Sequence, residues 1–256
     1  MKAIERWLVV AATVGTLAVN ALANTGGLGG VTTGEVASRY DLPFTPAGYV
    51  FSIWGLIYLG LAAFTAFQFA GAGTASARVG PVRPAYVFTA AANVTWLWFW
   101  HHEALLASLG VMLLLFGALA STYRALGASA PAGGREAWCV DVPFRLYTAW
   151  ITVATLANLS VVLATPGVVG TGLGPRGVSL AMIVVAAAIA AFAYLRLRDA
   201  VFLLTIAWAA SGVALKAGQP PSVSVPAMIL CGFAGLGAIG LLLEASRPAA
   251  GQSTTR

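Results

Sequence analysis

Long apolar runs alternate with short polar or glycine- and proline-rich connections along the whole chain. A helix needs about 20 apolar residues to cross the hydrocarbon core of a bilayer, and eight stretches are long enough. Their ranges are 7–23, 46–70, 85–101, 104–126, 143–164, 177–195, 200–216 and 224–244. Transmembrane β-strands would instead give alternating segments of about ten residues. The pattern therefore predicts an all-α polytopic membrane helix bundle of about eight transmembrane helices.

Composition supports the same class. Hydrophobic residues make up 59% of the chain and charged residues only 9%, whereas a soluble domain carries about 25% charged residues. The net charge is +6, but no run of basic residues could follow a phosphate backbone. The expected partner is therefore the lipid bilayer, with no nucleic acid, and a homodimer is left as an open alternative.

The basic residues predict the orientation, because cytoplasmic loops carry an excess of Lys and Arg. Eleven of the 14 fall on one side of the predicted spans: Lys2, Arg6, Arg78, Arg83, Arg124, Arg135, Arg145, Arg196, Arg198, Arg247 and Arg256. We expect both termini in the cytoplasm and the protein in a bacterial inner membrane. A competing interpretation takes residues 1–23 as a cleaved signal peptide, which would leave seven spans.

A glycine- and proline-rich connection at 165–177 divides the chain. Seven of the eight tryptophans precede it. We therefore expect a five-span body over residues 1–164 and a three-span extension over residues 165–256. The sequence of the second part does not repeat that of the first, so the pattern does not support a transporter built from inverted repeats.

Aromatic and amide residues recur at helical spacing within the first part. Trp54 and Tyr58 lie four residues apart, and Asn93 precedes Trp96 by three, so each pair shares a helix face. One interpretation is helix packing and anchoring at the membrane interface. The other is a pocket with aromatic walls and a few amide donors, suited to a flat apolar ligand.

Three motifs resemble one known family. They are the stretch from Pro43 to Tyr58, the motif Asn93-x-x-Trp96, and the run from Pro143 through Trp150 and Ala154 to Asn158. In this order they are similar to the tryptophan-rich sensory protein family (TspO/MBR, the translocator or peripheral benzodiazepine receptor family), over about residues 5–164. The chain departs from the family where Phe44 and Tyr49 replace tryptophans and Ala47 replaces a proline.

The resemblance implies a five-helix bundle whose ligand pocket opens toward the first loop, here residues 24–45, which would act as a lid. Members of the family bind porphyrins, haem, cholesterol or benzodiazepine-type drugs. We therefore expect a sensor or receptor for a tetrapyrrole- or sterol-like molecule. The ligand-binding residues that we predict are Phe44, Tyr49, Trp54, Tyr58, Asn93, Trp96, Trp100, Trp150 and Asn158. The cofactor is left open, with haem or a porphyrin considered only as a ligand.

Other chemistry receives less support from the sequence. No nucleophile–base pair, paired carboxylates or phosphate loop appears within the spans, so no catalytic residue is predicted. Adjacent histidines such as His101 and His102 point in different directions on a helix, which favours a polar cap at a turn over a metal site. A transporter of a small apolar substrate, or a membrane enzyme acting on a tetrapyrrole or lipid, could use the same pocket and remains an alternative.

Overall fold

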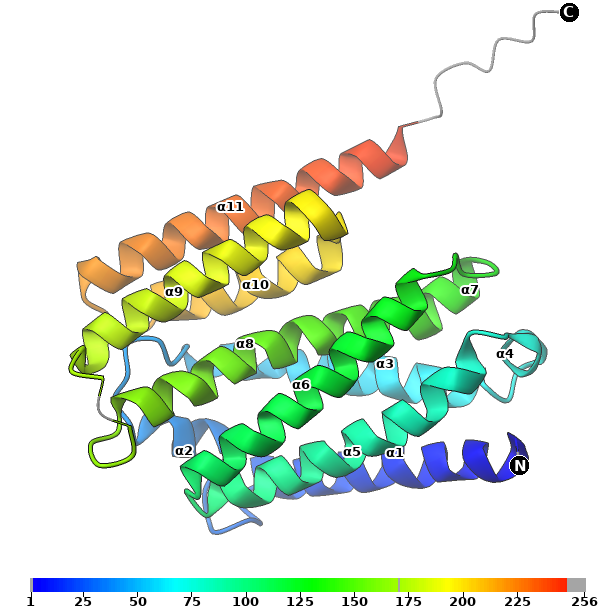
Figure 1. Cartoon of the computed structure of the whole chain (residues 1–256), viewed down its shortest axis with the longest axis horizontal. Coiled ribbons are helices and arrows are strands. Elements are labelled where there is room, and N and C mark those ends of the chain that lie inside the picture. Colours follow the sequence, from blue (N-terminus) through cyan, green and yellow to red (C-terminus); the bar gives the residue numbers. More distant parts are fainter. Residues whose placement is uncertain (1, 170, 248–256) are drawn as a thin grey trace, which may run out of the picture.

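The computed structural model describes residues 2–169 and 171–247, and it is all-helical within that part. Figure 1 shows the long helices running lengthwise along one bundle. They are α1 (Lys2–Asn24), α3 (Ile53–Phe67), α5 (Val79–His101), α6 (Leu105–Gly127), α8 (Val142–Ala164), α9 (Gly174–Phe192), α10 (Ala200–Ala214) and α11 (Pro221–Ser246). Arg256 of the basic side lies outside the described residues.

Shorter helical elements join these helices. They are α2 (Thr33–Ser38), the 3-10 turn η1 (Gly48–Ser52) that leads into α3, α4 (Gly71–Ala75), α7 (Gly134–Glu136), and the π-helical turns η2 (Ala137–Asp141) and η3 (Ala193–Leu197). The predicted lid, residues 24–45, therefore contains a helix of its own. Its first turn is fixed by a capping box in which Thr32 and Glu35 satisfy each other's backbone N–H groups.

The prediction of eight spans is wrong, because two of the eight long helices are too short or not apolar enough to count as membrane spans. Among the described residues, six helices are long and apolar enough to cross a membrane, and α10 is a shorter apolar helix. At 1.5 Å per residue, the 15 residues of α10 extend about 22 Å, less than the roughly 30 Å of a bilayer core. Helix α5 has 23 residues but is not among the six, because Pro81, Arg83, Pro84, Asn93 and His101 lower its hydropathy.

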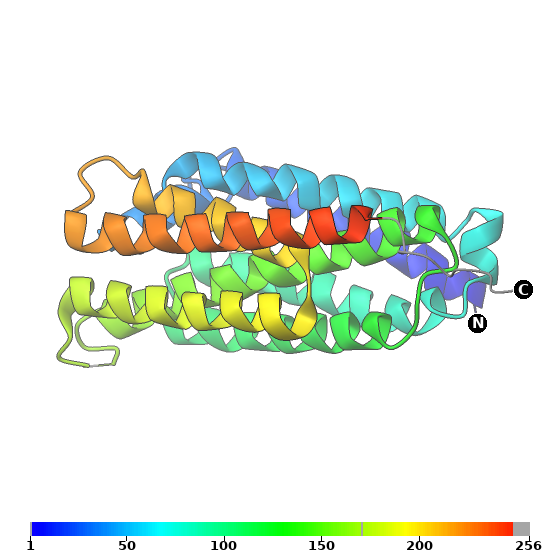
Figure 2. The ribbon, with the colours of Figure 1, turned by 90° about the horizontal axis from the view of Figure 1, so that it is seen from above.

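The helices form two groups, which Figure 1 shows one above the other; in Figure 2, seen from above, α9 and α11 lie over the remaining helices. The five-helix group consists of α1, α3, α5, α6 and α8, and the three-helix group consists of α9, α10 and α11. Each has its own cluster of buried hydrophobic residues, and Ala149 and Leu156 of α8 belong to the cluster of the three-helix group. Helix α8 therefore joins the two groups, while the division of the chain into domains at residue 164 stays a prediction.

The outward faces of the helices are apolar. Large exposed side chains include Leu59 on α3, Leu114 on α6, Val184 on α9 and Leu236 on α11. A water-soluble protein rarely exposes continuous apolar surface of this kind. These faces are suited to contact with lipid tails, and the chain is an integral membrane protein.

Buried charges hold together the end of the bundle at which α1 begins and α11 ends (Figure 1). The Arg78 guanidinium donates to Glu136 at 2.9 Å, to Asp141 at 2.6 and 3.1 Å, and to the carbonyl oxygen of Leu126 at 2.7 Å. Both carboxylates are almost fully buried. Because one guanidinium satisfies groups from three segments, it fixes the start of α5 against the end of α6 and the entry to α8.

Candidate ligand-binding site

The connection between α1 and α3, residues 25–52, crosses the bundle at the end opposite to these charges. We call it the α1–α3 connector. Glu103, in the turn between α5 and α6, accepts hydrogen bonds from Arg39 and from the Tyr40 hydroxyl, the latter at 2.8 Å. The bond from Tyr40, with the guanidinium of Arg39, lowers the pKa of Glu103. The first part of the connector is thus attached to the five-helix group.

His101 strengthens this attachment. Its Nδ1 lies 2.8 Å from the carbonyl oxygen of Leu28, and its Nε2 lies 3.2 Å from the Thr33 hydroxyl. The carbonyl requires a proton on Nδ1, so the ring is fixed between two points of the connector. His102 instead lies over the ring of Trp98. No group of three metal-ligating side chains occurs in the part of the chain that the structure describes.

The last part of the connector is attached to the three-helix group. The Ala47 N–H donates to the carbonyl oxygen of Gly212 at 3.0 Å, and the Trp208 indole donates to the carbonyl oxygen of Val50 at 3.0 Å. The Lys216 ammonium donates to the carbonyl oxygen of Leu42 at 3.0 Å. The connector therefore joins the two groups of helices across the space between them.

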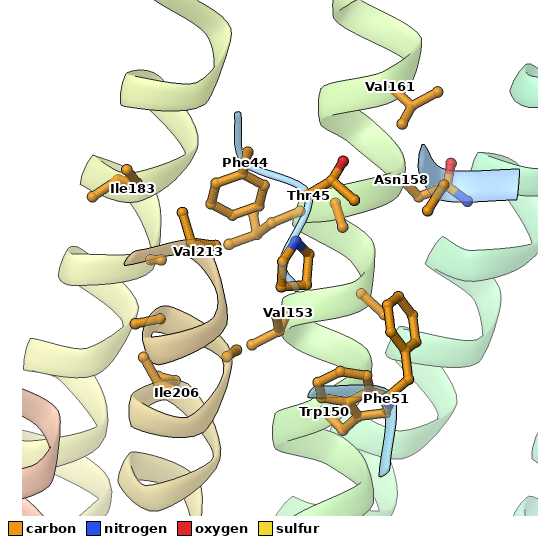
Figure 3. Close-up of a pocket in the computed structure, with 18 of the residues that line it drawn as sticks. Phe44, Thr45, Phe51, Trp150, Val153, Asn158, Val161, Ile183, Ile206 and Val213 are labelled. Carbon is orange, nitrogen blue, oxygen red and sulfur yellow. The ribbon is translucent and has the colours of Figure 1, made fainter. Parts of the chain in front are cut away.

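A crevice lies in that space, beside the connector. One wall is aromatic and comes from the five-helix group, with Trp54, Trp96, Trp100 and Trp150. The other wall is aliphatic and comes from the three-helix group, with Ile183, Ala186, Ile206, Ala209, Ala210, Val213, Ala227 and Leu230. Figure 3 shows Phe44 of the connector lying between Ile183 and helix α8, and Phe51 lying beside Trp150.

The crevice is narrow. Its cavity volume is only about 80 Å³, so its walls lie close together. We call this narrow crevice the slot.

Aromatic side chains support the five-helix wall from behind. Trp54 stacks on Tyr58 with ring centroids 5.5 Å apart, and its ring meets that of Trp150 edge-on at 6.1 Å. Trp96 stacks on Trp100 at 6.0 Å. Each indole of the wall therefore packs against a second aromatic ring, which restricts its rotation.

Three polar atoms of the crevice residues have no partner. The indole nitrogens Nε1 of Trp96 and Trp150 and the Oδ1 of Asn158 are buried, and none has a hydrogen bond within the described residues. The amide nitrogen of Asn158 donates to Ser108 at 2.6 Å, which fixes its orientation. A buried polar group without a partner costs about 1–3 kcal/mol, so these atoms are candidates for contact with a bound molecule.

Six of the nine predicted residues line the crevice: Phe44, Trp54, Trp96, Trp100, Trp150 and Asn158. Tyr58 lies behind Trp54. Asn93 faces α1, where its Oδ1 accepts a hydrogen bond from Asn20 at 2.8 Å. Tyr49 lies outside the crevice, with its hydroxyl 2.8 Å from that of Ser211.

The sequence does not reveal the aliphatic wall. Its residues are alanines, valines, isoleucines and leucines of α9, α10 and α11, and nothing in their spacing separates them from lipid-facing residues on the same helices. The expectation of a pocket formed only by the first five helices is therefore incomplete, because the described crevice lies between the two groups.

The architecture is that of an all-helical integral membrane protein in which tryptophans cluster around an apolar crevice. The chain matches the family model described as "TSPO-like protein" over residues 6–240, and it belongs to that family. The match continues past residue 164 through α9, α10 and most of α11, so it gives no support to treating these helices as an addition to the family. No curated protein and no solved structure matches the chain.

Proposed function

We propose that this protein is a membrane sensor or receptor that binds a planar hydrophobic molecule, of the tetrapyrrole or sterol type, in the crevice between the two groups of helices. The observation that carries the proposal is the slot itself, with four tryptophans on one side and unpaired polar atoms on Trp96, Trp150 and Asn158. Indole faces bind flat apolar rings, and the unpaired atoms give the ligand a preferred orientation.

The residues of the slot favour a metal-free tetrapyrrole over haem. Among the described residues that line it, none is a histidine, cysteine, methionine or tyrosine, and these are the residues that coordinate haem iron. The lining also contains no charged side chain. Acidic groups of a ligand would therefore lie outside the slot. Arg176 and Lys216 line a separate cavity of about 550 Å³ between the start of α9 and the connection from α10 to α11.

Binding requires the walls to separate. Pockets for molecules of drug size have volumes of about 300–1,000 Å³, and the slot, at about 80 Å³, is well below that range until its walls move apart. The α1–α3 connector is attached to both groups, so its bonds to Glu103 and Gly212 resist this movement. A ligand that enters would strain or release the connector, which gives a sensor a means of reporting occupancy.

We also propose that both termini lie in the cytoplasm and that the protein lies in a bacterial inner membrane. The support is the uneven distribution of Lys and Arg, together with the position of the start of α1 and the end of α11 at the same end of the bundle (Figure 1).

The test is a titration of protoporphyrin IX into the full chain purified in detergent, with tryptophan emission and porphyrin absorbance as readouts. We expect saturable binding. Trp150→Phe and Asn158→Ala should each lower the affinity about two- to twelvefold, the equivalent of one hydrogen bond. The matched control is Trp138→Phe, because this indole is 72% exposed.

One outcome of this titration would refute the proposed binding site. If Trp138→Phe lowers the affinity as much as Trp150→Phe, the porphyrin binds at the detergent-covered surface and the proposed site is wrong. Proteoliposomes separate the alternatives, since a transporter would move the porphyrin across the bilayer and an enzyme would consume it, whereas a sensor only binds it.

A further inference from the structure

A further cavity lies at the end of the bundle where α6 ends and α8 begins, opposite to the α1–α3 connector. Its volume is about 400 Å³. Its lining includes Arg124 at the end of α6, Arg145 near the start of α8, and Arg196 in η3, together with Tyr123, Phe144 and Leu197. The crevice described above uses none of these residues. We call this cavity the arginine pocket.

The acidic groups near the arginine pocket already have partners. Asp199 is 1% exposed and accepts hydrogen bonds from the Tyr123 hydroxyl at 2.7 Å and from the Phe202 N–H at 3.0 Å. Its Oδ2 also lies 3.7 Å from Nε of Arg145. Asp141, which lines the pocket, is bonded by Arg78 through two nitrogens.

Two of the three arginines remain available. Arg124 and Arg196 are exposed, and within residues 2–169 and 171–247 their side chains have no hydrogen bond or ion pair. The closest approach of Arg145 to Asp199 is through Nε at 3.7 Å. The pocket therefore presents guanidinium donors whose positive charge the protein does not neutralise.

The orientation of the protein in the membrane does not by itself explain why these arginines line one pocket. The positive-inside rule requires only that basic residues lie on one side of the membrane, and residues spread over the surface satisfy it. Here arginines from α6, α8 and η3 meet in one concave pocket that the two groups of helices share. Convergence of this kind is a property of a binding site.

Exposed apolar side chains lie close to Arg196 along the same helical stretch. Phe192, four residues before Arg196, is 55% exposed, and Leu195, directly before it, is 68% exposed. A ligand held by the arginines would thus have its remainder against exposed apolar side chains at the end of a membrane helix. That combination describes a lipid with an anionic headgroup.

We propose that the arginine pocket binds the phosphate group of an anionic phospholipid, with the acyl chains lying against Phe192 and Leu195. Guanidinium groups bind phosphate through paired, charge-assisted hydrogen bonds, and basic pockets between membrane helices on the cytoplasmic side hold lipid headgroups. A lipid in this position touches both groups of helices, so it stabilises their arrangement independently of the crevice.

The test measures lipid binding to the full chain in detergent by native mass spectrometry. The probes are dioleoyl phosphatidylglycerol and, for comparison, dioleoyl phosphatidylcholine. The test variant is the double substitution Arg124→Gln with Arg196→Gln. The matched control is Arg135→Gln with Arg247→Gln, which removes the same charge at the same end of the bundle from residues that are exposed, as Arg124 and Arg196 are, but do not line the pocket. Both doubles retain every hydrogen bond of Arg78 and Asp199.

We expect one phosphatidylglycerol per protein with saturable binding, weaker binding of phosphatidylcholine, and an affinity loss of about fivefold for each pocket arginine removed. Equal losses in the two double variants, or equal affinity for the two lipids, would overturn the proposal. A competition with glycerol phosphate and inorganic phosphate separates the sources. If either displaces the lipid at an equal concentration, the pocket is a site for a soluble phosphate compound and the lipid assignment is wrong.

Discussion

Gly212 sets the distance between helix α10 and the α1–α3 connector. A Cβ atom at this position would lie 2.1 Å from Cγ2 of Val50 and 3.0 Å from Cβ of Pro46. Val50 is fully buried, and a β-branched side chain has few rotamers with which to move away. The carbonyl oxygen of Gly212 also accepts the N–H of Ala47. Gly212→Ala should therefore force the connector away from α10.

The size of the effect follows from three contributions. Overpacking a dense interior costs about 1–3 kcal/mol. Weakening the hydrogen bond from Ala47 costs about 0.5–1.5 kcal/mol. Alanine is favoured over glycine within a helix by about 1 kcal/mol, which offsets part of this cost. We expect a net loss of about 0.5–3.5 kcal/mol in the free energy of unfolding, or about 2–4 °C in Tm for each kcal/mol.

The assay is thermal unfolding of the full chain in detergent, with Gly235→Ala as the matched control. Gly235 lies within α11, and a Cβ atom there would have no neighbour within 4 Å, so alanine should leave Tm unchanged or raise it. Adding Val50→Ala to the Gly212→Ala variant should recover stability, because it removes the clashing methyl group. If Gly212→Ala is as stable as Gly235→Ala, or if Val50→Ala brings no recovery, the close approach of α10 and the connector is wrong.

Three further predictions test other contacts. Arg78→Gln leaves two buried carboxylates without their counter-charge and should cost about 3–5 kcal/mol of stability in chemical unfolding; a loss below about 1 kcal/mol would contradict the buried cluster. Because the folded-state pKa of Glu103 lies below its ordinary value, its bonds to the connector stabilise the fold above the ordinary pKa of about 4.3 and lose this effect as the pH falls through the lower value. The protection of residues 33–42 against hydrogen exchange, relative to an unfolded peptide at the same pH, should thus fall as the pH drops below the ordinary pKa of Glu103, and Glu103→Gln should show low protection on both sides of it. Asn93→Ala removes the acceptor of Asn20 and should cost about 0.6–1.7 kcal/mol in detergent, without changing porphyrin affinity, because Asn93 lies outside the crevice.

The spacing of residues places side chains on common faces but does not show what each face contacts. Asn93, Trp96 and Trp100 share one side of α5, as about 3.6 residues per turn require. Yet Trp96 and Trp100 line the crevice, while Asn93 bonds to Asn20. The three residues lie at different levels along the helix, and a different neighbour meets the helix at each level.

Tyr49 shows a limit of the resemblance to the family, which alone placed this residue in the site. The predicted second span begins as an α-helix at residue 46. The chain instead forms the 3-10 turn η1 before α3, and a 3-10 helix has about three residues per turn. Side chains before Ser52 are therefore rotated relative to an α-helix, and Tyr49 packs edge-on against Trp208 outside the crevice.

The sequence by itself determined the class of the protein, the position of each long helix to within a few residues for most of them, the aromatic wall of the crevice and the resemblance to its family. These follow from local properties, namely the length of apolar runs, turn residues and the identity of side chains. The tertiary structure alone decided that α9, α10 and α11 supply the second wall and that three distant arginines meet in one pocket. The reason is that lipid tails are as apolar as a protein interior, so the sequence of a membrane helix does not distinguish the face that packs against protein from the face that meets the bilayer.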